Sequence, residues 1–155
     1  MTDYILPDAK SVQQILAAMY GDELVVDVDD SAPLAGRHVA TYVGDADSIV
    51  ALCACEDRFV AYSGAALTMI PANVADEMVE QKDLSAVILE NFHEVMNICS
   101  RLLMDDNSPH LRLEKTLLPG EADAAMSKVT QESRAVNLKV AIPEYGHGHM
   151  SFLIT

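Results

Sequence analysis

Glu94 and Asn97, an acid and an amide three positions apart, are the side chains whose types and spacing indicate chemistry. On an α-helix, residues three apart lie on adjacent turns of one ridge. A carboxamide has both a donor and an acceptor, so it can hold a water molecule in line with a phosphorus atom. The neighbouring carboxylate can bind a lysine of a partner protein. Neither group is a good nucleophile and a solvated Glu is a weak base, so covalent or metal-free hydrolysis by this pair is disfavoured.

The pair falls on the longest helix that the sequence predicts. Asp83 or Ser85 can cap this helix, and residues 87–104 contain no Gly or Pro. Apolar side chains recur at helical spacing along one side, which we expect to face the core. These are Ile88, Leu89, Phe92, Val95, Met96, Cys99, Leu102 and Leu103.

The opposite side of the same helix is polar. Glu90, Glu94, Asn97 and Arg101 fall together there and predict an exposed row, while His93 lies at its boundary and is expected to be partly buried. The row has two interpretations. It is either the ordinary solvated face of an amphipathic helix, in which an Asn costs a few tenths of a kcal/mol, or a site that enters another protein.

The elements around this helix predict an α+β fold with an antiparallel sheet packed against long helices, in a single domain over residues 1–155. A helix is expected over 8–20, because apolar residues recur at helical spacing and Gly21 supplies a stop. Alternation and turn residues predict the strands. We expect strands at 23–29, 37–43, 48–55, 111–118, 135–142 and 150–155, helices from 57 and from Pro71 to 80, a partly helical stretch at 119–133, and a turn at 144–149.

The charge of the chain limits its partners. Ten Lys and Arg against 24 Asp and Glu give a net charge of −14, which repels nucleic acid and anionic membrane surfaces. The first ten residues lack the basic start and apolar core of a secretory signal, and no apolar run reaches the roughly 20 residues of a membrane span. We therefore expect a cytoplasmic protein with no nucleic acid or membrane partner.

At the pair, the sequence resembles the CheC/CheX/FliY phosphatases of bacterial chemotaxis. Glu94-x-x-Asn97-Ile98 on a long helix, followed about twenty residues later by Pro119, looks like the signature of that family. The first helix has no such motif, so the chain is closer to CheX than to CheC. The resemblance implies a CheX-like fold and a phosphatase acting on the aspartyl phosphate of a CheY-like response regulator.

The resemblance also implies a role for each residue. Asn97 would orient the hydrolytic water and Glu94 would pair with the regulator's lysine, with Glu90, His93 and Arg101 contacting the partner. The chain would need no cofactor of its own, since the regulator supplies the phosphoryl group and Mg²⁺. CheX-like proteins are homodimers, which we expect here. The alternative is a non-catalytic adaptor of the same fold that recognises a receiver domain or a flagellar-switch component.

Other candidate residues favour structural roles. The three cysteines, Cys53, Cys55 and Cys99, match neither a zinc site nor a redox pair, and we expect buried thiols. His147 and His149 are expected on a solvated turn without a third metal ligand. His38 and His110 are expected in strands without partners. Asp27, Asp29 and Asp30 lack the Gly and closing Glu of a calcium loop, so we expect solvation at a strand end.

Overall fold

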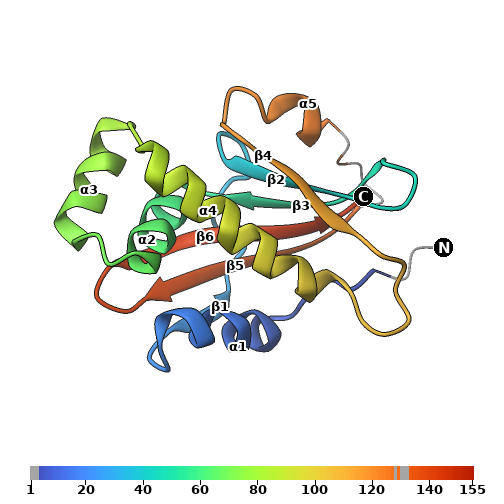
Figure 1. Cartoon of the computed structure of the whole chain (residues 1–155), viewed down its shortest axis with the longest axis horizontal. Coiled ribbons are helices and arrows are strands. Elements are labelled where there is room, and N and C mark those ends of the chain that lie inside the picture. The colour runs from blue at the N-terminus through green and yellow to red at the C-terminus, as the bar shows by residue number, and fades with distance from the viewer. Residues whose placement is uncertain (1–3, 128, 130–132) are drawn as a thin grey trace.

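A computed structural model describes residues 4–127, 129 and 133–155 (Figure 1). All of the strand pairs are antiparallel, and the strands form one sheet in the order β1-β5-β6-β3-β2-β4. This confirms the expected α+β fold. The strands are β1 (Val25–Val28), β2 (His38–Val43), β3 (Ile49–Cys55), β4 (Arg112–Leu117), β5 (Arg134–Ile142) and β6 (Gly146–Ile154).

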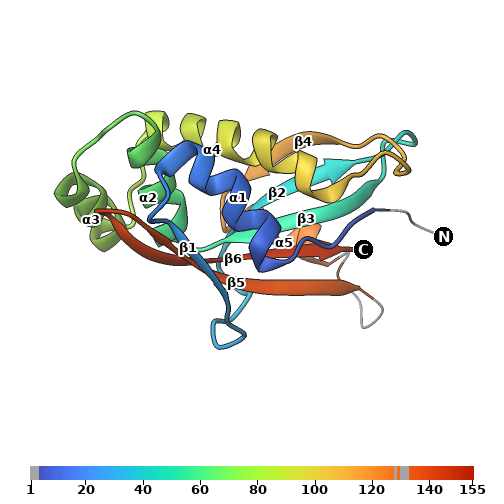
Figure 2. The same ribbon diagram turned by 90° about the horizontal axis from the view of Figure 1, so that it is seen from below.

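Three helices cover one face of this sheet: α1 (Ala9–Tyr20), α2 (Asp57–Leu67) and α4 (Ala86–Cys99) (Figure 2). The main core lies between them and the sheet and includes Leu16, Phe59, Phe92 and Phe152. The other elements are α3 (Ala72–Gln81), a 3-10 turn η1 (Ser100–Leu103) and a short α5 (Asp123–Met126). A smaller apolar cluster joins α5 to β2 and β3.

Two of the predicted helix signals, Gly21 and Ser85, are found at helix ends, and Asp8 adds a cap that was not predicted. The side chain of Asp8 accepts a hydrogen bond from the backbone N–H of Ser11 at 2.8 Å, and Gly21 ends α1 with φ of 106°. Ser85 caps α4 by accepting from the backbone N–H of Ile88. Asp8 and Ser85 thus fix the first turns of α1 and α4. No helix in the described part of the chain is long and apolar enough to cross a bilayer.

The turn expected at 144–149 is present but shorter, over 143–145, because β6 already begins at Gly146. His147, Gly148 and His149 lie within the strand and pair with β5. Gly148 serves packing: a Cβ there would lie 2.5 Å from the backbone nitrogen of Phe59 at the start of α2. A glycine inside a strand can mark such a close backbone approach as well as a turn.

The long helix is shorter than predicted. It ends at Cys99 and continues as η1, where the N–H of Ser100 bonds to the Asn97 carbonyl. The hydroxyl of Tyr42, which is fully buried, donates to the Met96 carbonyl at 2.7 Å. This bond falls on the carbonyl that a continuing α-helix would offer to Ser100. Of the stretch 119–133, only Asp123–Met126 is α-helical among the residues described, and 128 and 130–132 lie outside them.

The N-terminal segment packs beside the end of η1. The N–H of Ile5 donates to the Leu103 carbonyl at 2.8 Å, and the guanidinium of Arg134 donates to the Tyr4 carbonyl at 3.3 Å. The hydroxyl of Tyr4, a largely buried residue, donates to the His110 carbonyl at 3.3 Å. The segment therefore ties the end of the α4–η1 unit to β5 and to the loop that follows η1.

Candidate functional site

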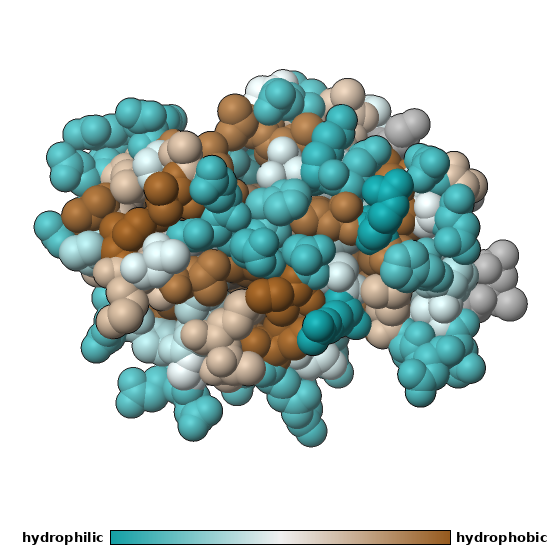
Figure 3. Space-filling model, viewed as in Figure 1, coloured by the Kyte–Doolittle hydropathy of each residue, from teal (hydrophilic) through white to brown (hydrophobic). Residues whose placement is uncertain are grey.

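The candidate site is the exposed side of α4 and η1. Glu90, His93, Glu94 and Asn97 on α4 and Arg101 on η1 are all exposed. The buried residues of α4 are Ile88, Phe92, Val95, Met96 and Cys99, as the helical spacing predicts. His93 is more exposed than expected. Figure 3 shows hydrophilic side chains over α4 in the middle of this face, with hydrophobic ones on both sides.

Within the described residues, the side chains of Glu94 and Asn97 make no hydrogen bond or ion pair. Three positions apart on a helix, their Cβ atoms are separated by about 5–6 Å. Asn97 takes part in the fold through its backbone carbonyl, which accepts from the hydroxyl of Ser100 at 2.7 Å. The carboxylate and the carboxamide therefore have their full hydrogen-bonding capacity available to a partner or to water.

The backbone under this pair is firmly held. Asn91 donates its amide to the Gly64 carbonyl at 2.9 Å and to the Thr68 hydroxyl at 3.0 Å, which joins α4 to α2. Gly64 lets the two helices approach closely, because a Cβ there would lie 3.0 Å from the Ile88 carbonyl oxygen. The bond from Tyr42 to Met96 falls on the peptide that joins Met96 to Asn97. The pair thus projects from a rigid support.

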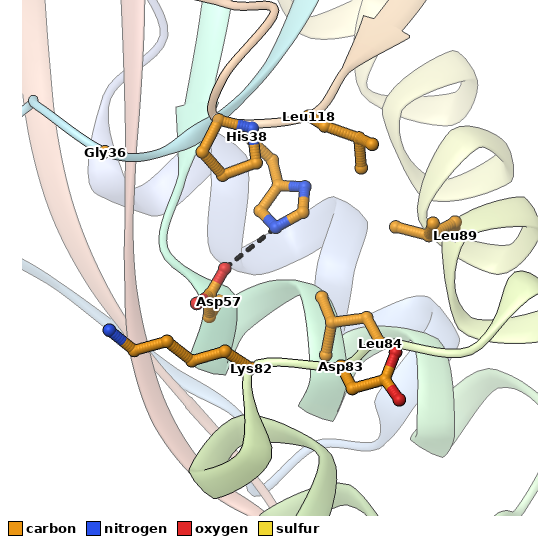
Figure 4. Close-up of a pocket in the computed structure, with 9 residues that line it drawn as sticks. Gly36, His38, Asp57, Lys82, Asp83, Leu84, Leu89 and Leu118 are labelled. Atoms are coloured by element: carbon orange, nitrogen blue, oxygen red, sulfur yellow. Dashed lines mark hydrogen bonds and ion pairs between the residues drawn. The ribbon is translucent and has the colours of Figure 1, made fainter.

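A cavity of about 440 Å³ lies beside the N-terminal half of α4 (Figure 4). It contains His38, whose Nε2 lies 2.8 Å from a carboxylate oxygen of Asp57. Burial lowers the pKa of His38 below its ordinary value of 6.5, although the carboxylate of Asp57 acts in the opposite direction. The expectation that His38 lacks a partner is therefore wrong. Pro119 also lines this cavity and comes from the β4–α5 connection.

The His38–Asp57 pair was not expected from the sequence, because its members belong to separate elements. Strand register is the signal that would have found it. His38 is opposite Cys55 in the β2–β3 pair, and Asp57 is two residues beyond Cys55, at the start of α2. His110, in contrast, lies in the loop before β4, so its expected place in a strand is wrong.

His149 is also partnered, contrary to the expected solvated turn. Its Nδ1 lies 2.7 Å from a carboxylate oxygen of Glu56, and its Nε2 lies 3.2 Å from one of Asp29. Hydrogen bonds from Ser31, and then from His149, hold the pKa of Asp29 below its usual range. Asp29 is therefore an organised part of the loop between β1 and β2, where we expected only solvation.

The cysteines are buried free thiols, as predicted. The sulfur atoms of Cys53 and Cys55 are 3.7 Å apart, and burial raises the pKa of Cys53 and of Cys99. Thiols in such surroundings are unreactive, because burial disfavours the thiolate form that acts as a nucleophile. Among the residues that the structure describes, no group of three or more His, Cys, Asp or Glu is arranged to hold a metal ion.

Comparison with known proteins gives solved structures of the same fold. No family model and no curated protein sequence matches the chain. FliY from Thermotoga maritima superimposes with a TM-score of 0.60 at 13% identity, covering 94% of this chain and 82% of that chain. The FliM middle domain from H. pylori gives 0.51 at 11% identity over 94% and 84%, and a match to the FliG–FliM complex from H. pylori gives 0.50. CheX from Desulfovibrio desulfuricans gives 0.47 at 11% identity over 94% and 95%.

At such identities the likeness concerns the fold. The chain has the fold of FliY and of the FliM middle domain, and this confirms the resemblance that the sequence indicated, at the level of the fold.

Proposed function

We propose that this chain is a phosphatase that accelerates hydrolysis of the aspartyl phosphate of a CheY-like receiver domain. The observation that carries the proposal is the exposed pair Glu94 and Asn97, whose side chains make no hydrogen bond or ion pair within the described residues and project from an anchored helix. The fold shared with FliY supports it.

Asn97 acts by positioning. Its carboxamide oxygen accepts a hydrogen bond from a water molecule and its amide nitrogen donates to a phosphoryl oxygen, so the water is held in line with phosphorus. The peptide before Asn97 is fixed by Tyr42, and this lowers the entropy cost of placing the water. Proton acceptance is assigned to the phosphoryl group or the regulator, since a carboxamide is not a base.

Glu94 docks. Its carboxylate lies one turn from Asn97 and binds the lysine of the receiver domain, which sets the distance between Asn97 and the phosphorus atom. Glu90, His93 and Arg101 surround the pair and contact the rim of the partner's cleft. Mg²⁺ comes with the receiver domain and requires no ligand from this chain. We also carry over a homodimer from the resemblance, which light scattering or sedimentation tests directly.

The test is the lifetime of phosphorylated receiver domains with and without the protein. The wild-type protein should shorten the lifetime of its cognate domain. Asn97→Ala should reduce the acceleration by about a hundredfold or more, the usual cost of losing one preorganised transition-state contact. Its stability should stay equal or rise by a few tenths of a kcal/mol, because Ala is the better helix former at an exposed position.

Asn107→Ala is the matched control, since Asn107 is also exposed but lies in the loop after η1. It should keep the full acceleration. The proposal is wrong if the wild-type protein leaves the phosphate lifetime of every receiver domain of its host unchanged. The assigned mechanism is wrong if folded Asn97→Ala is as active as the wild type.

A non-catalytic binding module is the second candidate. It is favoured by the match to the complex in which FliM is bound to FliG. In this case the same α4 face would bind a receiver domain or a flagellar-switch component without changing any phosphate lifetime. Binding to such a partner that is lost in Glu94→Lys, together with unchanged dephosphorylation, would select this candidate over the phosphatase.

A further inference from the structure

The cavity beside α4 has features that the proposed phosphatase does not use. His38, the first residue of β2, lines the cavity, and Figure 4 shows its ring between Leu118 and Asp57. Leu84, Leu89, Leu118 and Pro119 supply apolar wall. A second, smaller hollow shares His38, Leu89 and Leu118 and adds Phe92, so the apolar surface continues past the imidazole.

The hydrogen-bonding state of His38 follows from its surroundings. Burial disfavours the charged imidazolium, so the ring is neutral near pH 7. Its Nε2 faces a carboxylate, which only accepts, so Nε2 carries the proton and donates to Asp57. The Nδ1 atom is then the unprotonated nitrogen of the ring and acts as an acceptor.

This acceptor opens onto the cavity. No Nδ1 partner of His38 exists among the described residues, and none of their buried side-chain nitrogen or oxygen atoms lacks a partner. Nδ1 therefore reaches open space, although the residue as a whole is only 4% exposed. A neutral imidazole fixed in one tautomer by Asp57 and packed edge-on against Phe92 is a preorganised acceptor.

Three charged side chains line the cavity, and one of them, the carboxylate of Asp57, is already hydrogen-bonded to His38. Lys82 and Asp83 are both exposed and lie side by side in sequence at the cavity edge, with opposite signs. The cavity of about 440 Å³ is within the range of small-molecule sites. A dry cavity of about 150 Å³ already holds benzene, so one or two rings fit here.

We propose that this cavity binds an uncharged, mostly apolar molecule of one or two rings that carries one hydroxyl group, with the hydroxyl donating to Nδ1 of His38 and the rings packed on Leu89 and Leu118. The phenols are the simplest members of this class. The site lies on α4 but does not depend on Glu94 or Asn97, so it stands or falls apart from the phosphatase.

The experiment uses p-cresol and its methyl ether, 4-methylanisole, as probes of nearly equal shape. Each is titrated into the wild-type protein, and the methyl signals of Leu84, Leu89 and Leu118 and the ¹⁵N signals of His38 are followed by NMR. Only p-cresol can donate to Nδ1. We expect p-cresol to bind about tenfold more tightly than 4-methylanisole, as one net hydrogen bond implies. The Nδ1 signal should start as that of an unprotonated nitrogen and move on binding.

His38→Phe removes the acceptor but keeps a ring beside Phe92, so it should abolish the preference between the probes. His147→Phe is the matched control, because His147 is exposed on β6 and does not line the cavity. It should keep the preference. Equal affinity for both probes in the wild type would overturn the proposal, even if His38→Phe failed to fold. Absence of any shift at the three leucines would overturn it as well.

Discussion

The hydroxyl of Tyr42 is expected to stabilise both the fold and the candidate site, which Tyr42→Phe tests. Tyr42 is fully buried beneath α4, and its hydroxyl donates to the Met96 carbonyl at 2.7 Å. The Ser100 N–H is engaged with the Asn97 carbonyl, so it does not replace this donor. Tyr42→Phe therefore leaves a buried carbonyl oxygen without that partner.

The expected cost is about 1–3 kcal/mol, the penalty for one unsatisfied buried polar group. For a chain of this length, that corresponds to a fall in melting temperature of roughly 2–12 °C. Because the affected peptide joins Met96 to Asn97, the rate of the proposed phosphatase reaction should also fall at temperatures where the variant is folded. Urea unfolding followed by circular dichroism measures the first effect, and receiver-domain dephosphorylation measures the second.

Tyr145→Phe is the matched comparison. The hydroxyl of Tyr145 also donates to a carbonyl, that of Ile70 at 2.6 Å, but Tyr145 is only half-buried, so water can take over the bond. Its loss should cost less than about 1 kcal/mol. If Tyr42→Phe were as stable as the wild type, or no less stable than Tyr145→Phe, the inferred anchoring of the α4 end would be refuted.

Two further variants test the packing of α4 against α2 and the buried neutral state of His38. Gly64→Ala should destabilise the protein by about 1–3 kcal/mol in urea unfolding, because the added Cβ meets the Ile88 carbonyl oxygen at 3.0 Å; an unchanged unfolding midpoint would show that α2 and α4 shift freely. The pKa of His38 is lowered by burial, so the unfolded chain takes up its proton more readily and stability should fall as the pH drops below about 6.5 and through the folded-state pKa. The slope of unfolding free energy against pH should be smaller in His38→Phe over that range, and equal slopes would contradict the burial of a neutral ring.

Local signals predicted most elements correctly. The α1 helix ends at the predicted Gly21, and the β2–β3 hairpin was predicted to within a residue at each end. Helical spacing also separated the buried side of α4 from Glu94 and Asn97. Each of these features depends on residues close together in the sequence, which is why one sequence was enough.

The errors arose where distant residues decide. Gly148 looked like a turn residue, but it serves the contact between β6 and Phe59. The α4 helix ends at Cys99 with no Gly or Pro there, beside the bond from Tyr42 to the Met96 carbonyl. His93 is exposed because no other described element covers its side of α4, which helical spacing does not reveal. The roles of Glu94 and Asn97 remain predictions, because a role in another protein's cleft is a property of two surfaces.

The N-terminal segment at Tyr4 and Ile5 helps to hold the end of the α4–η1 unit, and α4 is the helix that bears Asn97. A chain shortened to start at Leu6 would lose the donor to the Leu103 carbonyl, the acceptor for Arg134 and the apolar ring of Tyr4. The carbonyl end of η1 would then fray toward Asn97. Removing Tyr4 and Ile5 would thus loosen the support of Glu94 and Asn97 without changing either residue. A fusion partner is better attached upstream of an intact Tyr4.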